Sequence, residues 1–205
     1  MQQEERSERS RSALLDAALA LFSSQGYRAT SVRDIADRAG TSTGSVYHHF
    51  RDKEAIFQTL LDHFWLASSS PDFPLMRIFE DGAFPGDLPA IGRAAQHTVS
   101  TWRPYIALIY VDVVEFEGRH IHRFYEDLAA HYEDFLSRRP ELHIGDRIRD
   151  GIPPVVAMML TTRIYMYYFV VETLFGVQNH YGLNSDDATK LIAEVLTGGI
   201  LKSES

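Results

Sequence analysis

The sequence predicts an all-α protein with a small N-terminal head and a larger helical body. Apolar residues recur at spacings of three and four along most of the chain, and no segment alternates as a half-buried strand does. With 205 residues, 45% of them hydrophobic, and no cysteine, the chain can bury a sizeable core without disulfides. We expect a helix-turn-helix DNA-binding domain over residues 1–60 and a helical ligand-binding and dimerisation domain over residues 61–205.

Four helices joined by short turns are predicted in the head. Each has a residue type typical of a helix end: glycine after the last turn, or serine or aspartate before the first. The predicted helices are one that Gly26 ends, one from Val32 to Ala39 capped by Ser31, Thr43–Phe50 capped by Ser42, and one from Lys53 to about Leu66 capped by Asp52.

The body begins after a segment rich in serine, proline and glycine, Ser68–Gly86, which we interpret as a loop with room for one helical turn. A second break of the same kind covers Pro140–Pro153. The predicted body helices are Leu88–Thr101, Pro104–Glu117, Arg119–Arg138, Pro154–Asn179 and Asp186–Lys202.

Charge and composition exclude several kinds of protein. The net charge is −8, but residues 1–60 hold eight Lys or Arg and eight Asp or Glu, so the acidic excess lies wholly in the body. A neutral head still permits local contacts with phosphate. Without cysteine, a phosphate-binding loop or a repeated Glu-x-x-His pattern, we predict no catalytic residue, metal site or cofactor.

No membrane span is predicted, and we expect the protein in the cytoplasm. The most apolar stretch, Val155–Phe175, is interrupted by Arg163 and Glu172. Its longest apolar run, Ile164–Val171, falls far short of the roughly 20 residues that a span needs. The arginines near the N-terminus lead into a helical pattern rather than a secretory leader, and the absence of cysteine fits a reducing compartment.

The second and third head helices form a helix-turn-helix pattern, in which the second helix of the pair can enter a major groove. At 3.6 residues per turn, Val46 and Phe50 lie about 40° apart, and we expect them to face Ile35 and Ala36. His48 then points almost directly away from Val46. A solvated helix face is the alternative interpretation.

The residues around His48 suit a nucleic-acid contact. Gly44 and Ser45 are small enough to let the helix backbone approach a base or phosphate, while Tyr47 offers a hydroxyl. Adjacent histidines point about 100° apart on a helix, so His48 and His49 are poorly placed to share a metal ion.

The run TSVRDIADRAGTSTGSVYHHFRDKEAIF, Thr30–Phe57, resembles the DNA-binding signature of the TetR family of transcriptional regulators. The resemblance extends back through ALLDAALALFSSQGY and covers about residues 11–60. It departs from the family at Thr41, where valine is usual, and at Asp52. The DNA-contacting positions that it implies are Thr30, Ser31, Arg33, Ser42, Thr43, Gly44, Ser45, Tyr47, His48 and Lys53.

Arginines precede the matching segment. Arg6, Arg9 and Arg11 are either a basic arm that reaches neighbouring phosphates or a frayed, solvated terminus. The sequence leaves both interpretations open.

The last two helices carry more apolar surface than one small bundle should need, and a second copy of the same helices would cover it. A buried helix within one chain is the alternative. The residues predicted at a dimer interface are Met159, Arg163, Val170, Leu174, Leu191 and Val195.

The helix IALIYVDVVEFEG is apolar nearly all round, yet it contains two carboxylates one turn apart. With nearby aromatic residues it would suit an apolar or flat ligand that has a cationic or hydroxyl group. The alternative is an aromatic core in which Glu115 is exposed or pairs with Arg163 or Arg119. The predicted ligand-binding residues are Trp102, Tyr105, Tyr110, Asp112, Glu115, Phe116, His120, Tyr165 and Tyr168.

These observations, with the resemblance, predict a homodimeric transcriptional regulator. It would bind a palindromic operator as a repressor and be released by a small-molecule effector. The competing hypothesis is a helical ligand-binding or protein-interaction module that no longer reads DNA.

Overall fold

The computed structural model describes residues 2–202, and over these residues the protein is all-α. The strand-like feature within this range is one isolated antiparallel bridge between Ile148 and Leu201. The predicted fold class is therefore confirmed.

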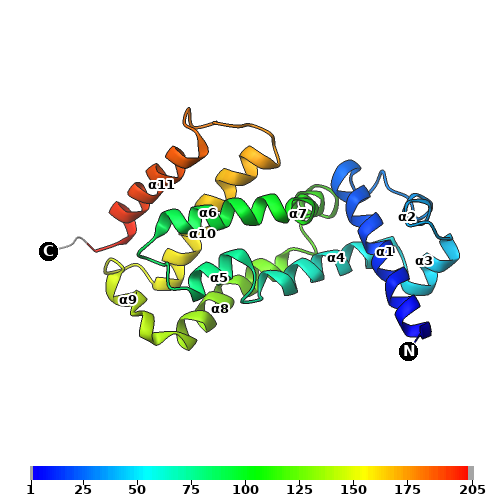
Figure 1. The fold of residues 1–205 in the computed structure, drawn as a ribbon, viewed down its shortest axis with the longest axis horizontal. Coiled ribbons are helices and arrows are strands. Elements are labelled where there is room, and N and C mark those ends of the chain that lie inside the picture. The colour runs from blue at the N-terminus through cyan, green and yellow to red at the C-terminus, as the bar shows by residue number, and fades with distance from the viewer. Residues whose placement is uncertain (1, 203–205) are drawn as a thin grey trace. The chain divides into compact units, whose positions relative to one another are not determined.

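The chain forms two compact units (Figure 1). Unit 1 runs up to Leu66 and also includes Pro104–Arg123; unit 2 consists of Ala67–Arg103 and the chain from Phe124 onward. The helices of unit 1 are α1 Gln2–Gln25, α2 Val32–Arg38, α3 Thr43–His49, most of α4 Lys53–Ser68 and nearly all of α7 Arg103–Phe116. Those of unit 2 are α5 Pro74–Glu80, α6 Leu88–Thr101, nearly all of α8 His122–Arg138, the 3₁₀ turn η1 Pro140–Leu142, α9 Ile144–Arg147, α10 Pro154–Thr173 and α11 Ser185–Ile200.

The predicted caps of the head helices are present. Ser31 and Asp34 form a reciprocal capping box at the start of α2, and the Ser42 hydroxyl accepts from the backbone N–H of Ser45 at 3.2 Å. Asp52 Oδ1 accepts from Ala55 N at 2.7 Å and so caps α4. Because these partners lie three residues apart, local sequence is enough to specify them.

The N-terminal arginines lie on a helix rather than on an extended arm. α1 begins at Gln2, so Arg6, Arg9 and Arg11 all belong to its first half. Gly26 ends this helix with a φ of 87°, a left-handed conformation that glycine adopts without a steric penalty.

The core of unit 1 contains a helix from far along the chain. Leu14, Phe22, Ile35 and Val46 are buried there, and Leu108 of α7 is fully buried in the same cluster. The head therefore packs around α7 as well as around its own four helices.

Unit 2 is built on contacts of α6 with α10 and α11. The closest approach is at Gly92 of α6, where an added Cβ would lie 2.6 Å from Thr189 Cγ2 and 2.8 Å from Tyr165 Cε1. A larger residue there would require the side chains of Thr189 and Tyr165 to move.

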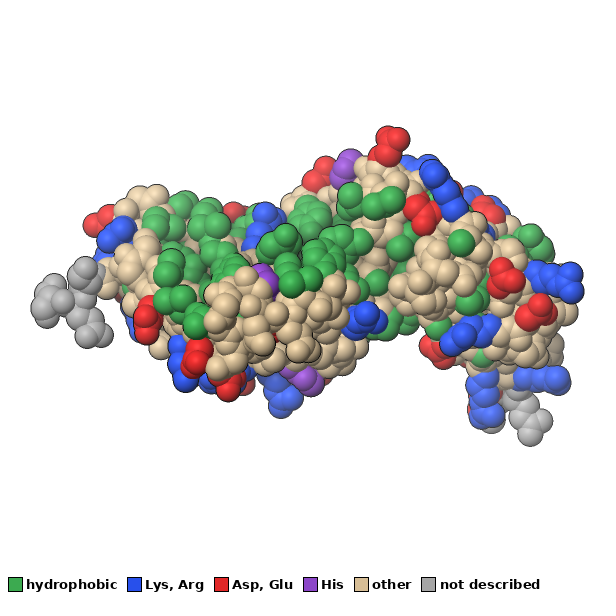
Figure 2. All heavy atoms as spheres, turned by 90° about the horizontal axis from the view of Figure 1, so that it is seen from above, with side chains coloured by type: hydrophobic (Ala, Val, Ile, Leu, Met, Phe, Trp, Pro, Cys, Tyr) green, Lys and Arg blue, Asp and Glu red, His purple; other side chains and the backbone are tan. Residues whose placement is uncertain are grey.

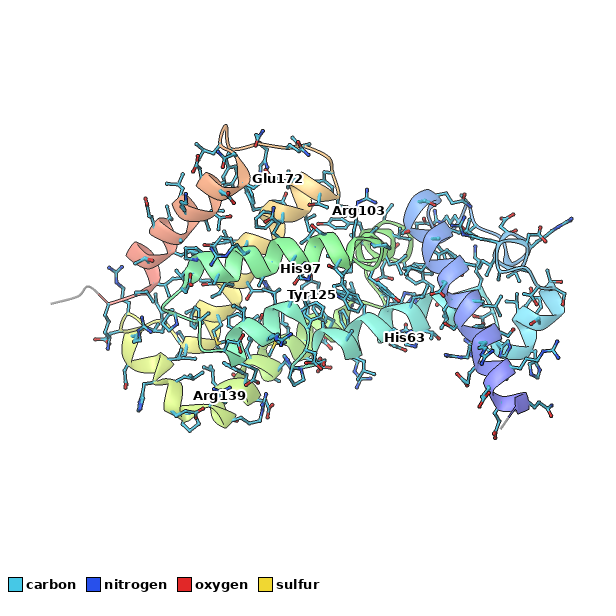
Figure 3. The ribbon with its side chains drawn as sticks, viewed as in Figure 1. His63, His97, Arg103, Tyr125, Arg139 and Glu172 are labelled. Carbon is cyan, nitrogen blue, oxygen red and sulfur yellow. The ribbon has the colours of Figure 1, made fainter. Side chains whose placement is uncertain are left out.

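α10 ends at Thr173, six residues before the predicted end at Asn179. Glu172, labelled in Figure 3, accepts hydrogen bonds from Tyr168 Oη, Asn179 N and Ser185 Oγ at 2.8, 3.0 and 2.6 Å. These contacts tie the following loop to the helix end, and Gly176 turns the chain with a φ of 73°.

Three further differences from the sequence prediction exceed two residues, and the remaining predicted helix ends agree to within two residues. The predicted loop Ser68–Gly86 contains α5, which buries Leu75, Met76 and Phe79, and the break after α8 contains η1 and α9. α8 begins at His122 instead of Arg119, because Glu117 and Gly118 have positive φ values of 58° and 74°.

By length and apolar composition alone, α10 could cross a membrane. However, 39% of its most apolar window is buried inside the protein, and it packs against α6. Within unit 2 it acts as a core helix.

Candidate nucleic-acid interface

α3 places its side chains as the helical spacing predicts. Val46 is 1% exposed and packs into the core, whereas Tyr47 is 58% exposed. Thr43, Gly44 and His48 are exposed as well. The outward face of α3 is therefore small at its N-terminal end and carries hydrogen-bonding rings further along.

The first half of α1 covers one flank of α3. The hydroxyls of Ser10 and Ser45 lie 3.5 Å apart, and the Arg11 guanidinium stands 5.1 Å from the centre of the Phe50 ring. Burial lowers the pKa of His49, and the positive charges of His48 and Arg11 lower it further. Ser45 and His49 thus border α1, a contact that the helical spacing of α3 does not predict for Ser45.

The residues that lead into α2 have different environments. Thr30 is 1% exposed, and its hydroxyl donates to Gly26 O at 2.8 Å, so this side chain points into the head. Ser31 caps α2 and is exposed. The Arg33 side chain is 83% exposed, and its Nε lies 3.7 Å from Asp37 Oδ2.

Lys53, at the start of α4, is held by the backbone of the α1–α2 turn. Its Nζ donates to Tyr27 O and Thr30 O, both at 2.7 Å, and lies 3.9 Å from the centre of the Tyr27 ring. Burial lowers the pKa of the ammonium, although the nearby carboxylates of Glu115 and Asp34 oppose that effect.

Glu115, at the end of α7, contacts the same turn. Its Oε1 accepts from Tyr27 N at 2.9 Å and its Oε2 from Arg28 N at 2.7 Å. The side chain is 15% exposed, and Arg28 Nε lies 3.9 Å from Oε2. Both carboxylate oxygens therefore already have backbone donors from the head.

A second carboxylate of α7 holds the turn that follows the helix. Asp112 is fully buried, and its Oδ2 accepts from His120 N and Ile121 N at 3.2 and 3.0 Å. Its Oδ1 lies 2.6 Å from His120 Nδ1, and the other ring nitrogen of His120 lies 3.2 Å from Glu54 Oε1 on α4. Asp112 and His120 thereby connect the end of α7 to the start of α4.

A comparison with known protein families identifies the head. The family described as bacterial regulatory proteins of the tetR family matches residues 14–60, which contain α2, α3 and their caps. Residues 14–60 of this chain belong to that family. The family consists of transcriptional regulators rather than enzymes, in agreement with the prediction that this chain is not an enzyme.

The transcriptional repressor KstR2 of Mycobacterium tuberculosis is 44% identical to this chain over 89 residues, which are 40% of this chain and 44% of the relative. The matched segment thus spans less than half the length of that repressor. KstR2 of Rhodococcus jostii is 54% identical over 54 residues, which are 26% of each protein.

Solved structures extend the likeness in fold to nearly the whole chain. A structure assigned to the TetR family from Mesorhizobium loti has a TM-score of 0.64 at 22% identity and covers 96% of this chain and 99% of its own. The structure of Mycobacterium tuberculosis KstR2 has a TM-score of 0.56, also at 22% identity, and covers 94% and 95%. At this identity the comparisons show a TetR-like fold for both units.

The nine residues predicted to bind a ligand are divided between the units. Tyr105, Tyr110, Asp112, Glu115, Phe116 and His120 belong to unit 1, and Trp102, Tyr165 and Tyr168 belong to unit 2. In unit 2 the Tyr165 hydroxyl donates to Thr189 O at 3.1 Å, and burial raises the pKa of Tyr165 to about 12. The Tyr168 hydroxyl donates to Glu172, and burial raises its pKa as well.

The six residues predicted at a dimer interface have unequal exposure. Leu191 and Val195 of α11 are 45% and 68% exposed, whereas Val170 is 5% exposed and faces the core of unit 2. Arg163 is exposed, and Met159 and Leu174 are half-buried. The exposed apolar side chains of α10 are Val156, Leu160, Ile164 and Tyr167. Figure 2 shows hydrophobic side chains gathered over α11 and the end of α10.

Unit 2 also has a hollow of about 280 Å³ between the end of α8 and the start of α10. Its lining includes Leu136, Arg139, His143 and Pro154 and contains none of the predicted ligand-binding residues. Arg139, labelled in Figure 3, donates hydrogen bonds to Glu80 and Glu141.

The contacts of Lys53 and Glu115 with the α1–α2 turn, and that of Asp112 with His120, could not be found from local sequence. Each joins residues at least 8 positions apart, and the Glu115 contact spans 88 positions. One signal was available in the sequence. α7 is apolar nearly all round, and such a helix must be packed against other elements on most of its sides.

Proposed function

We propose that this protein is a homodimeric transcriptional repressor that binds operator DNA through α3. The exposed face of α3 carries the proposal: Thr43, Gly44, Tyr47 and His48 point outward from a helix that Val46 anchors in the core. Small residues allow close approach to the duplex, and the rings supply donors and acceptors for phosphates or base edges. The match of residues 14–60 to the tetR family supports the same function.

A homodimer is supported by the exposed apolar side chains of α10 and α11. An apolar stripe on two adjacent helices is stabilised when the same stripe of a second copy covers it, and a twofold axis does this with one kind of surface. Two heads related in this way would read the two halves of a palindromic operator.

An apolar or aromatic effector is the third part of the proposal. The KstR2 structure is described as that of a ketosteroid transcriptional regulator. A ketosteroid is flat and apolar, so it is the first compound class that we would test. Relief of repression requires only that the effector bind one arrangement of the two heads better than the other, with a coupling of about 1–3 kcal/mol. We propose a cytoplasmic location, where the chromosome is accessible.

Binding to the DNA upstream of the protein's own gene tests the proposal. We expect the purified protein to shift a labelled fragment from that region in the presence of excess unrelated DNA, with an affinity that falls steeply as salt rises. Equal binding to a shuffled fragment of the same composition would instead favour a helical interaction module that no longer reads DNA.

A further inference from the structure

We propose that Glu115 is a positioning residue of the DNA-reading head, which fixes the turn that leads into α2, the first helix of the helix-turn-helix pair. The inference rests on the proposed DNA-binding function and assigns Glu115 a role in it. The sequence pattern alone predicts a place for this residue in a ligand pocket.

The first observation is that Glu115 binds the backbone of the α1–α2 turn with both carboxylate oxygens. Tyr27 N and Arg28 N donate to separate oxygens at 2.9 and 2.7 Å, and Arg28 Nη2 donates to the Glu115 carbonyl at 3.3 Å. Hydrogen bonds to an ionised acceptor are stronger than neutral ones. The turn is therefore fixed by a side chain that enters from α7.

The second observation is that Lys53 binds backbone carbonyl groups of the same turn, whereas Glu115 binds its N–H groups. The Lys53 ammonium donates to the carbonyl oxygens of Tyr27 and Thr30. An anion on two N–H groups and a cation on two carbonyls leave residues 27–30 little freedom. Ser31 follows directly and caps α2, so the direction of α2 depends on this turn.

The third observation is the lack of room at Gly26. A Cβ added there would lie 2.7 Å from Glu115 Oε1, and the residue has a φ of +87°. Glycine at this position therefore lets the chain turn and lets the carboxylate approach the two N–H groups.

The end of α7 is itself held in place, so Glu115 projects from a fixed support. Leu108 anchors the helix in the core of unit 1, and the buried Asp112 accepts from the two backbone N–H groups that follow the helix. Through His120 and Glu54, the same helix end is connected to the first turn of α4.

If Glu115 positions the turn, its removal should weaken operator binding in a characteristic way. Without Glu115 the head keeps every charge and side chain of α3, but the turn before α2 samples more conformations, which must be reordered on DNA. Affinity should then fall while the slope of log affinity against log salt stays unchanged, because no phosphate contact is lost.

The test compares Glu115→Gln and Glu115→Ala with Glu117→Gln, which makes the same chemical change at an exposed residue two positions further on. We expect operator affinity to fall about tenfold in Glu115→Ala and less in Glu115→Gln, which keeps one acceptor oxygen. Amide exchange at Tyr27 and Arg28 should quicken in the same order. Glu117→Gln should match the wild type in both measurements.

Each outcome has a distinct meaning. If the wild type does not prefer the operator fragment, the proposed DNA-binding function fails. If the wild type binds it and Glu115→Gln binds equally well although Tyr27 and Arg28 exchange faster, the positioning role is wrong. A flattened salt slope in the Glu115 variants would also overturn it. Because Glu115→Gln preserves size and one acceptor, it guards against a simple failure of Glu115→Ala to fold.

Discussion

At the scale of single residues, a substitution of Tyr47 tests DNA contact without changing the stability of the head. Tyr47 is 58% exposed next to the buried Val46, so removing its ring should leave the head folded. We expect Tyr47→Ala to lower operator affinity about tenfold, as the loss of one good contact does, with little change in melting temperature. Fluorescence anisotropy and thermal unfolding measure the two effects. Unchanged affinity at moderate salt would remove Tyr47 from the interface.

Lys53 should behave differently, because two carbonyl oxygens of the turn depend on it. We expect Lys53→Met to lower both the melting temperature and operator affinity, since Tyr27 O and Thr30 O lose a charged donor. The salt dependence then tests the contact implied by the TetR-family resemblance. Flattening of the slope by about one unit would indicate that the third N–H of Lys53 reaches a phosphate, whereas an unchanged slope would restrict Lys53 to the turn.

The sequence predicts the side-chain directions on α3 correctly, because they depend only on helical geometry. Helical geometry alone places Val46 inward and His48 outward, and the structure agrees. Glu115 shows the limit of that reasoning. Its direction depends on a partner that only the folded chain brings near, the N–H of Arg28, which lies 87 positions away.

At the scale of helices, local signals specify most starts, and distant contacts decide several ends. Ser31, Ser42 and Asp52 start their helices as predicted because each cap partner lies within three residues. The end of α10 depends on Ser185, which lies 13 residues beyond Glu172. No local pattern indicates that contact, although Gly176, which turns the chain just after α10, is a local stop signal that lies before the predicted end.

Glu172 makes the end of α10 sensitive to acid. Burial alone would raise its pKa, but hydrogen bonds from Ser185, Tyr168 and Asn179 together hold the pKa below its ordinary value of 4.5. A carboxyl with a lowered pKa in the folded state stabilises the protein above its unfolded pKa, and that contribution is lost as pH falls through the folded pKa.

The expected result concerns the free energy of unfolding between pH 7 and pH 3, measured with urea. The wild type should lose stability below about pH 4.5, and Glu172→Gln should lose less over the same range because it cannot titrate. At pH 7 the variant should be about 1–3 kcal/mol less stable, since its amide cannot accept from all three donors. Parallel pH curves for the two proteins would contradict this account.

At the scale of the whole molecule, the sequence predicted an all-α chain with a DNA-reading head but assigned α7 to the body. In the structure α7 completes the core of unit 1, because a helix that is apolar nearly all round needs cover on several faces. The N-terminal helices alone leave the space that Leu108 fills. The position of a helix in the sequence is thus a poor guide to the unit to which it belongs. The distribution of apolar residues around the helix better indicates how many neighbours it needs.

The dimer is the prediction that belongs to the whole molecule. Leu160 and Tyr167 of α10 are 44% and 61% exposed on the proposed interface, and a charge there would be buried without a partner in the dimer. We expect Leu160→Glu to sediment as a monomer at micromolar concentration, where the wild type sediments as a dimer. Leu66→Glu is the matched control, since Leu66 is 77% exposed on α4 and lies outside this face.

Operator binding should follow the oligomeric state. A monomer has one head and can read only one half of a palindrome, so Leu160→Glu should bind a full operator about as weakly as the wild type binds a single half-site. Leu66→Glu should keep the wild-type preference for the full operator. A Leu160→Glu protein that remains dimeric would show that α10 is not the interface. One that is monomeric yet binds the full operator at wild-type strength would show that two linked heads are not required.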